Sequence, residues 1–444
     1  MSAPDKADDA EKVALPSGDK KPLLVAVAMG YGHLRPAHAL GDYLQTPVRE
    51  ADHPPLADAY EGKLWARARG PYEAGSRLSQ LPFVGVPLKA ALAALTVIPP
   101  LNPPRDLSAP TLPLRLIERL ANRGLGDGLV AYMRQSQQTL LTTYFVPALL
   151  ADRAGGLDVR CVVTDSDINR VWAPLRSSAT KILYYAPSTR VVRRLMAYGV
   201  PQGRIKMTGF PLPHELLGGR DFTVAKANLA RRLARLDRGG LFRKQAAAEL
   251  EPIVGAPLIA DGPPRITFAV GGAGAQAELA DDFLPSLAPA LRAGKLSLTL
   301  VAGVRREVAE RFERSLARSG LTRERDRSIE ILIADNIADY FRRFNARLAD
   351  SDALWTKPSE MTFFAALGLP VILAPAVGEH EKLNARWASE HGAALPQRDP
   401  RVARNWLDEW LDDGTLAGAA WNGFRALPKS GLYDIADDLA VTNA

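Results

Sequence analysis

Short apolar runs alternate along the chain with glycine-rich turns and helix-like stretches. Residues 23–28 are continuously apolar, a glycine turn follows at 30–33, and residues 36–44 have a helical pattern. Unbroken apolar runs are typical of strands buried on both faces, and a strand that leads through a glycine turn into a helix indicates a parallel α/β sheet. Further elements are predicted as strands at 159–165 and 181–185 and a helix at 191–198, and residues 204–211 close this half of the chain.

The same pattern begins again in the second half of the chain. Residues 266–270 are apolar and lead into glycines at 271–274. More strands are predicted at 296–301, 329–333, 353–356 and 371–374. The sequence therefore predicts an α/β protein with two Rossmann-like, doubly wound domains that face each other across a ligand-binding cleft. The expected divisions are a disordered tail at 1–21, an N-terminal domain at 22–215, an inter-domain connection at 216–264, a C-terminal domain at 265–400 and terminal helices at 401–444.

One segment, residues 82–101, departs from this pattern because it is almost entirely apolar. Lys89 and four prolines interrupt it, so it cannot form the unbroken stretch of about 20 apolar residues that a membrane-spanning helix needs. Basic residues at 67, 69 and 77 precede it. The pattern leaves two interpretations open, a buried or domain-capping helix and an interfacial segment that touches lipid.

Composition narrows the chemistry. The 444 residues include one cysteine, Cys161, which excludes an internal disulfide and thiolate metal clusters. Lys and Arg number 56 against 49 Asp and Glu, and this net charge of +7 suits anionic partners such as phosphate-bearing ligands or acidic lipid. The basic run at 231–235 has helical spacing, which favours a solvated helix face, so no nucleic-acid partner is expected.

The first residues lack the apolar core of a signal peptide, which predicts a cytoplasmic protein. If the segment at 82–101 is interfacial, the protein associates with the cytoplasmic face of a membrane.

Two glycine turns can bring the backbone close to a ligand. At residues 30–37 a histidine, His33, follows Gly32, and its ordinary pKa suits a general base near neutral pH. Taken alone, this turn also fits a structural histidine. At residues 271–276, successive small residues can present backbone amides to a diphosphate. Neither turn has the GxGxxG pattern of dinucleotide sites or the Lys-Ser order of a P-loop.

Polar residues also gather after two strands of the second half, at 356–362 and 378–384. Because parallel strands end at one edge of a sheet, these residues are expected to line the same wall of the cleft. A lysine and hydroxyl groups there suit a phosphate, and a carboxylate suits a ribose diol.

Together these motifs resemble family 28 of the GT-B glycosyltransferases. This group contains the peptidoglycan lipid-intermediate N-acetylglucosaminyltransferase, the monogalactosyldiacylglycerol synthases and the processive diacylglycerol glucosyltransferases. Residues 32–37 resemble its GHxxPA turn, and residues 163–172 resemble its TDxxxHxxW segment. Residues 197–211 are similar to its GxPxxxIxxTGxP run, and residues 352–370 with 378–384 are similar to its donor-binding elements.

The resemblance implies a metal-independent, inverting transfer of a sugar from a nucleoside diphosphate, usually UDP, to a hydroxyl acceptor, with a lipid as one candidate. It needs no cofactor, places the acceptor in the N-terminal domain and places the donor in the C-terminal domain. It assigns His33 as the base, with Asp165 supporting or replacing it. The donor-binding positions that it implies are Gly32, Gly271, Gly272, Gly274, Gln276, Ile337, Lys357, Ser359, Glu360, Glu381 and Asn384. Of these, Lys357, Ser359 and the amides of 271–274 would hold the diphosphate, Glu381 and Asn384 would contact the sugar, and the backbone near Ile337 would contact the base.

The chain departs from the family pattern at the presumed catalytic and ribose positions. Asn169 stands where the family has the histidine of its TDxxxH segment. The usual ribose-binding glutamate falls on Phe363, and Glu360, one turn earlier, is the nearest carboxylate for the same diol. Two other functions stay open on this pattern, a non-hydrolysing nucleotide-sugar epimerase and a non-catalytic scaffold that binds a sugar nucleotide or a lipid.

Overall fold

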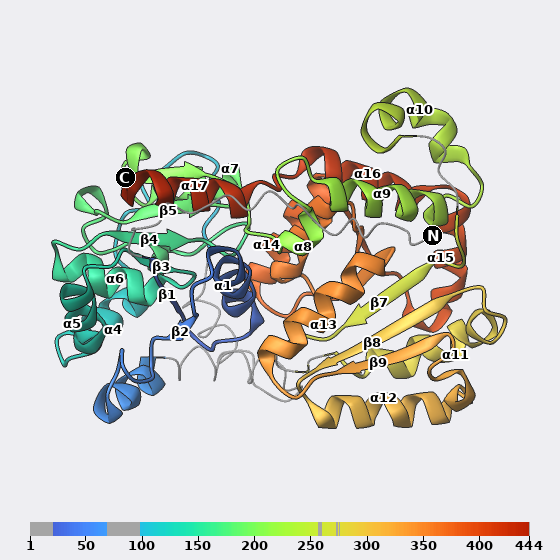
Figure 1. Cartoon of the computed structure of the whole chain (residues 1–444), viewed down its shortest axis with the longest axis horizontal. Helices are drawn as coiled ribbons and strands as arrows, with labels where there is room; N and C mark the ends of the chain where they lie inside the picture. Colours follow the sequence, from blue (N-terminus) through green and yellow to red (C-terminus); the bar gives the residue numbers. More distant parts are fainter. Residues whose placement is uncertain (1–20, 69–97, 256–259, 272–273, 275, 444) are drawn as a thin grey trace, which may run out of the picture.

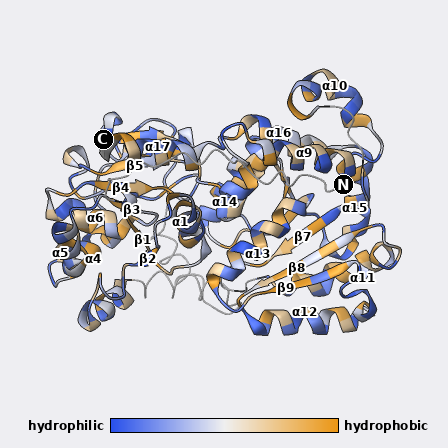
Figure 2. Cartoon of the chain, viewed as in Figure 1, coloured by the Kyte–Doolittle hydropathy of each residue, from blue (hydrophilic) through white to orange (hydrophobic). Residues whose placement is uncertain are grey.

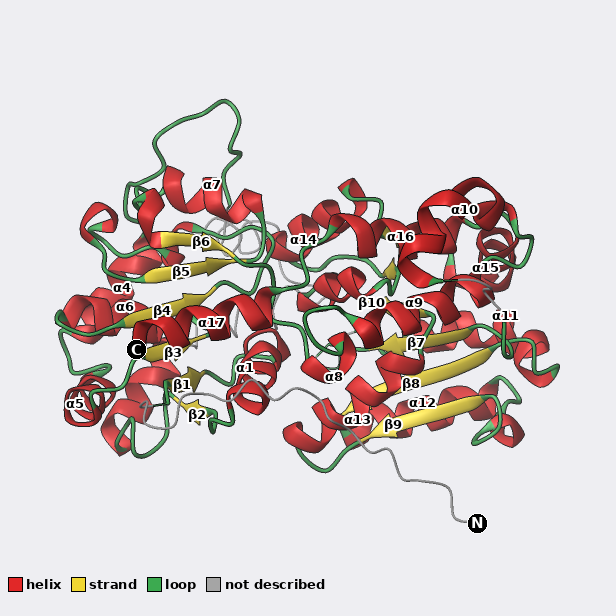
Figure 3. Ribbon diagram, turned by 45° about the horizontal axis from the view of Figure 1, so that its top comes forward, coloured by secondary structure: helices red, strands yellow, loops and turns green. Residues whose placement is uncertain are grey.

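The computed structural model describes residues 21–68, 98–255, 260–271, 274 and 276–443. Each half of the chain forms a six-stranded sheet in which all strand pairs are parallel. Helices flank each sheet, and the two layered units lie side by side (Figure 3). The predicted fold class, α/β with two Rossmann-like domains, is therefore confirmed.

The sheet of the N-terminal domain has the strand order β2-β1-β3-β4-β5-β6. The order reverses between β1 and β3, so the loops after these two strands border the crevice where ligands of such sheets bind. The strands are β1 (Leu23–Ala26), β2 (Arg49–Glu50), β3 (Leu140–Thr142), β4 (Val159–Val162), β5 (Leu183–Ala186) and β6 (Ile205–Met207).

The sheet of the C-terminal domain has the order β12-β11-β10-β7-β8-β9. Here the reversal lies between β7 and β10, so the loops after these two strands form the equivalent position. The strands are β7 (Arg265–Ala269), β8 (Ser297–Gly303), β9 (Ile329–Ile333), β10 (Ala353–Thr356), β11 (Val371–Leu373) and β12 (Ala394–Pro396).

Helices connect the strands as the parallel topology requires (Figure 1). In the N-terminal half they are α1 (Tyr31–Leu44), α4 (Leu112–Ala121), α5 (Asp127–Ser136), α6 (Phe145–Ala154) and α7 (Thr189–Ala197). The segment between the sheets forms α8 (His214–Leu217), α9 (Thr223–Leu236) and α10 (Leu241–Val254). The second half has α11 (Leu279–Arg292), α12 (Arg306–Arg318), α13 (Ile337–Asp350), the 3-10 helix η5 (Glu360–Leu367), α14 (Glu379–Glu390), α15 (Ala403–Asp412), α16 (Thr415–Ala426) and α17 (Gly431–Asn443).

Apolar strands form the core of each domain. All four residues of β1 are buried, and the strands are coloured mostly as hydrophobic while the outer helix faces are hydrophilic (Figure 2). The predicted strands all occur within a few residues of their expected positions. Four strands, β2, β3, β6 and β12, have no predicted counterpart, and each has only two or three residues, too few for a clear apolar run.

The prediction that the basic run at 231–235 forms a solvated helix face is wrong. Arg232 and Arg235 of α9 are each 2% exposed. Arg235 pairs with Asp352 and Asp261, at 3.2 and 2.5 Å. Arg232 donates three hydrogen bonds to the backbone carbonyls of Leu348, Ser351 and Leu367, at 2.8, 2.7 and 2.8 Å. The run therefore holds the ends of α13 and η5 instead of facing solvent.

Two expectations fall largely outside the described residues. These are the tail, of which residue 21 alone is described, and the apolar segment at 82–101, of which 98–101 are described. Within the described parts of the chain, no helix is both long enough and apolar enough to cross a bilayer.

The chain returns to the N-terminal domain at its end. Helix α17 runs along the N-terminal sheet, above β5 in the view of Figure 1. Its Asp438 accepts hydrogen bonds from the Tyr185 hydroxyl at 2.7 Å and from Arg160 at 3.2 Å. The C-terminal end of the chain therefore ties the two domains together.

The two domains also meet through α1 and α13. The Tyr31 ring lies 5.0 Å from the ring of Tyr340, and the Arg35 guanidinium lies 4.6 Å from the centre of the Phe341 ring. His38 contacts Phe341 at 5.2 Å. Residues 31, 35 and 38 share one face of a helix, so one face of α1 packs against α13 of the C-terminal domain.

Candidate functional site

His33 lies in the first turn of α1, at the strand-order reversal of the N-terminal sheet. Gly30 precedes the helix with φ of 102°, a conformation that favours glycine. The Nδ1 atom of His33 lies 3.0 Å from the carbonyl oxygen of Thr143, which follows β3, and 3.0 Å from Oγ1 of Thr164, which follows β4. The Thr143 hydroxyl also donates to the His33 carbonyl at 2.7 Å. Two loops therefore fix both the ring and the backbone of this histidine.

These contacts determine which nitrogen of His33 can act as a base. A carbonyl oxygen only accepts, so the bond to Thr143 requires the proton on Nδ1 and leaves the lone pair on Nε2. Burial lowers the pKa of His33 below its ordinary value, and the Asp165 charge and the Thr143 carbonyl offset only part of this shift. The rings of Tyr144 and Trp172 lie 4.7 and 6.2 Å from the imidazole. The imidazole is therefore neutral at pH 7, with Nε2 as its acceptor.

Asp165, the predicted partner of His33, is linked to the other domain. Its Oδ1 accepts a hydrogen bond at 3.2 Å from Asn384 of α14. The Asn384 carbonyl oxygen accepts from the backbone N–H and the hydroxyl of Ser166, at 2.9 and 2.7 Å. The side chain of Asn384 is fully buried. The structure therefore places this predicted sugar-binding residue against the N-terminal loop after β4.

Lys357, Glu381 and Gly271 come together at the strand-order reversal of the C-terminal sheet. The Lys357 ammonium lies 2.5 Å from Glu381, which also accepts from the backbone N–H of Val377 at 2.7 Å. Burial raises the pKa of Glu381, but Lys357 and the Val377 amide outweigh it and hold the pKa below its ordinary value. A Cβ on Gly271 would collide with the Lys357 side chain, so glycine permits this approach. A cation thus lies directly over the glycine turn.

The rest of the glycine turn carries a second cation that the sequence motifs did not indicate. A Cβ on Gly274 would lie 3.3 Å from Cδ of Arg305, which follows β8. Gln276 ties the turn to the loop after β11 by donating to the Pro375 carbonyl at 2.6 Å. Gly272 lies outside the described residues. Arg305 therefore joins Lys357 as a candidate ligand for a diphosphate.

Glu360 lies beneath the first glycine turn, across the domain boundary. A Cβ on Gly32 would lie 3.6 Å from its Oε2, and its Oε1 lies 3.4 Å from Nε of Arg35. Both partners of this ion pair are buried. Ser359 caps η5 by accepting from the Met361 N–H at 3.4 Å. Glu360, the carboxylate predicted to bind the ribose diol, is therefore paired with Arg35.

Two other predicted positions lie apart from these contacts. Ile337 begins α13, and among the described residues no hydrogen bond or ring contact links it to the other donor-binding positions. Phe363, at the usual place of the ribose glutamate, stacks on Phe210 with ring centres 4.6 Å apart and an angle of 8° between the planes. The ribose position is thus part of an aromatic contact between the domains.

Thr143 and Arg35 are further site residues that sequence reasoning missed. Thr143 follows the short apolar run of β3, and its position after a strand was the only available signal. Arg35 lies inside the glycine–histidine turn motif, but its partner Glu360 is 325 residues away, a pairing that local patterns do not reveal.

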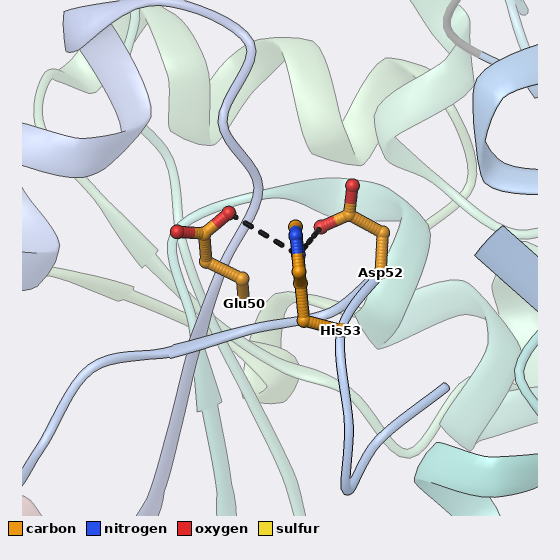
Figure 4. A group of neighbouring side chains, drawn as sticks. All are labelled: Glu50, Asp52 and His53. Atoms are coloured by element: carbon orange, nitrogen blue, oxygen red, sulfur yellow. Dashed lines mark hydrogen bonds and ion pairs between the residues drawn. The ribbon is translucent and has the colours of Figure 1, made fainter. Parts of the chain in front are cut away.

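One cluster of potential metal ligands occurs in the described ranges, at the end of β2. His53 Nδ1 lies 3.0 Å from Asp52 and 3.5 Å from Glu50 (Figure 4). The His53 side chain is 63% exposed. Imidazole–carboxylate contacts of this kind are ordinary on a protein surface, so the cluster is not assigned as a metal site, and the expected absence of a metal stays a prediction.

Comparisons with known proteins give matches at the level of structure. No protein-family model matches the chain. No curated protein sequence matches it either. Among solved structures, Acinetobacter baumannii MurG is similar with a TM-score of 0.50 and 15% identity, covering 95% of this chain and 99% of MurG.

Two further matches are weaker. S. aureus MnaA, solved with UDP, has a TM-score of 0.49 and 11% identity, covering 94% of this chain and 95% of MnaA. SnogD from Streptomyces nogalater, a glycosyltransferase, has a TM-score of 0.46 and 14% identity, covering 95% and 99% of the two chains. The match to MurG extends over nearly the whole of both chains, and at this identity it shows the fold. The chain has the two-domain GT-B fold that its resemblance to glycosyltransferase family 28 predicts.

Proposed function

We propose that the protein is a glycosyltransferase that moves a sugar from a UDP-linked donor to a hydroxyl acceptor with inversion of configuration. The observation that carries the proposal is the His33 ring, whose Nδ1 is fixed by Thr143 so that Nε2 is left as the acceptor. A Cβ on Gly32, the residue before His33, would lie 3.6 Å from Glu360, and Lys357 lies three residues before Glu360 and against Gly271. A base and a cationic glycine turn thus lie on either side of one domain boundary.

In this reaction His33 accepts a proton and the donor loses its diphosphate. Nε2 takes the proton from the acceptor hydroxyl while that oxygen attacks the anomeric carbon from the side opposite the leaving group. The new carbon–oxygen bond forms as the bond to the diphosphate oxygen breaks, and the electron pair leaves with UDP. Asp165 stabilises the imidazolium that results, because its negative charge favours the protonated ring.

The leaving diphosphate would be stabilised by Lys357, Arg305 and the backbone amides near Gly271. In the structure Lys357 is paired with Glu381. The donor phosphates would therefore bind the Lys357 ammonium together with Glu381 or displace Glu381 from it. The positive charges of Lys357 and Arg305 beside the glycine turn support a reaction that needs no metal ion.

The proposed acceptor class rests on one interpretation of the sequence, in which residues 82–101 are an interfacial segment. The apolar segment at 82–101 motivates a lipid acceptor or a membrane surface as partner, and cytoplasmic placement of the enzyme belongs to the same proposal. Sedimentation of the purified protein with anionic vesicles tests it, and equal recovery in the supernatant with and without vesicles would contradict membrane association.

Calorimetric titration with UDP and GDP, followed by UDP release from a panel of UDP-sugars in the presence of a lipid extract, tests the transferase. His33→Ala is expected to abolish acceptor-dependent UDP release and to leave the affinity for UDP unchanged, because the imidazole contacts the acceptor. His53→Ala is the matched control, since His53 is exposed at the end of β2. Full activity in His33→Ala would overturn the assignment of the base.

A second function, a non-catalytic scaffold of the same fold, is favoured by one observation. Phe363 replaces the ribose-binding glutamate and is stacked on Phe210. If neither UDP nor GDP binds in the same titrations, the scaffold is supported and the transferase is rejected.

A further inference from the structure

Asn384 joins the loop after β4 to the helix α14 of the other domain. Its amide makes three hydrogen bonds, one to Asp165 at 3.2 Å and two with Ser166 at 2.9 and 2.7 Å. An asparagine side chain has two acceptor sites and two donor hydrogens, so three of the four are used. The side chain is fully buried. The three hydrogen bonds of the Asn384 side chain therefore all go to residues of the N-terminal domain.

The same helix reaches the candidate diphosphate site one turn earlier. Glu381 precedes Asn384 by three residues, so the two side chains are neighbours on one face of α14. Glu381 holds the Lys357 ammonium at 2.5 Å, beside the Gly271 turn. One face of α14 thus contacts the presumed leaving-group site and the loop that carries Asp165.

The position of Asp165 matters because several charged groups act on His33. Asp165 from the loop after β4 and Glu360 from η5 favour the protonated ring, whereas His380 from α14 and burial oppose it. Asp165 has the largest influence of these charges. Thr164, the residue before Asp165, lies 3.0 Å from Nδ1 of His33, so the loop that carries Asp165 is in contact with the ring. A side chain that fixes Asp165 therefore contributes to how strongly His33 holds a proton.

We propose that Asn384 is a positioning residue that holds Asp165 beside His33, so that the basicity of His33 depends on contact between the two domains through α14. This inference rests on the proposed function of His33 as the base. It differs from the role implied by the family resemblance, in which Asn384 contacts the donor sugar. Through Asn384, the pKa of His33 depends on α14, the same helix that contacts the candidate diphosphate site through Glu381.

Histidine-labelled NMR titration of the full-length protein tests the proposal without any substrate. The signal of His33 is assigned by its loss in His33→Gln. In Asn384→Ala the carboxylate of Asp165 loses its donor, and the pKa of His33 is expected to fall by roughly half a unit. In Asn384→Asp a second carboxylate lies near the ring, and the pKa is expected to rise. An unchanged or raised pKa of His33 in Asn384→Ala would overturn the proposal.

Two further variants provide controls. Ser166→Ala removes one bond to the Asn384 oxygen and keeps the backbone one, so it is expected to shift the pKa of His33 in the direction of Asn384→Ala by a smaller amount. It also carries the test if Asn384→Ala does not fold. Lys382→Ala, an exposed change on the same helix, is expected to cause no shift.

Binding experiments separate this proposal from its alternative and from the proposed function. If Asn384 contacts the sugar, Asn384→Ala weakens binding of UDP-N-acetylglucosamine or UDP-glucose relative to UDP and leaves the pKa of His33 unchanged. That result would overturn the positioning role. If no nucleotide binds the wild-type protein, the proposed transferase fails, whereas the response of His33 to Asn384 still confirms or rejects the coupling.

Discussion

At the scale of single residues, the chemistry of His33 depends on which ring nitrogen carries the proton. The Thr143 carbonyl fixes that choice, and burial keeps the ring neutral. The residue types at positions 33 and 357 indicate a base and a phosphate ligand from the sequence. The tautomer cannot be predicted in this way, because Thr143 is 110 residues away and follows a strand of only three residues.

The lowered pKa of His33 predicts the pH dependence of transfer. A base must be unprotonated, and burial moves the protonation of His33 below its ordinary value of about 6.5. The value of kcat/KM is therefore expected to stay constant as pH falls through 6.5 and to decline only at lower pH. Asp165→Asn is expected to move the decline to still lower pH, because it removes a charge that favours the protonated ring. A decline centred above pH 6.5 would contradict this assignment.

Lys357→Ala is expected to weaken UDP binding about tenfold, which corresponds to about 1.5 kcal/mol for a hydrogen bond to a charged group. Isothermal titration calorimetry measures the change. Lys382→Ala removes an exposed lysine and serves as the control. Because Lys357→Ala also leaves the buried Glu381 unpaired, the double variant Lys357→Ala/Glu381→Gln separates lost binding from lost folding. Equal dissociation constants in wild type and both variants would remove Lys357 from the site.

At the scale of elements, apolar periodicity predicts strands well and polar helix faces poorly. The strand at 329–333 matches its expected range because a short run of apolar residues predicts a strand that is buried in a sheet. Arginines with helical spacing fit two environments, since their side chains either face solvent or donate hydrogen bonds to carbonyls at the ends of other elements. On α9 the second applies, and Arg232 donates to the carbonyls of Leu348, Ser351 and Leu367 at the ends of α13 and η5.

Arg232→Ala is therefore expected to destabilise the protein by about 3 kcal/mol, because it removes the arginine donor from the carbonyls of Ser351 and Leu367 and leaves the Leu348 carbonyl with the Ser351 N–H alone. Urea unfolding monitored by tryptophan fluorescence measures the free energy. Arg238→Ala, in which the lost ion pairs with Asp408 and Asp412 lie at the surface, is expected to cost less than about 1 kcal/mol. Equal losses in the two variants would show that burial of Arg232 contributes nothing.

At the scale of the whole molecule, the two domains are joined by contacts that no local pattern encodes. Two α/β domains could be predicted from the repeated strand–turn–helix unit. The family resemblance implies that Lys357 and the Gly271 turn bind the same diphosphate, and the two lie together in the structure. The pairing of Arg35 with Glu360 and the stacking of Phe363 on Phe210 could not be predicted, because each joins residues far apart in the chain. These contacts decide which side chains remain available to a donor.

Arg35 tests whether this junction holds the domains together. Its guanidinium pairs with the buried Glu360 and lies 4.6 Å from the centre of the Phe341 ring. Arg35→Ala leaves Glu360 buried without its cation, which is expected to cost about 3 kcal/mol in urea unfolding and to increase the radius of gyration in small-angle X-ray scattering. Arg49→Ala removes an arginine that contacts Tyr132 within one domain, and it should leave the scattering curve unchanged. An unaltered radius of gyration in Arg35→Ala would mean that the covalent connections and α17 hold the domains together without this ion pair.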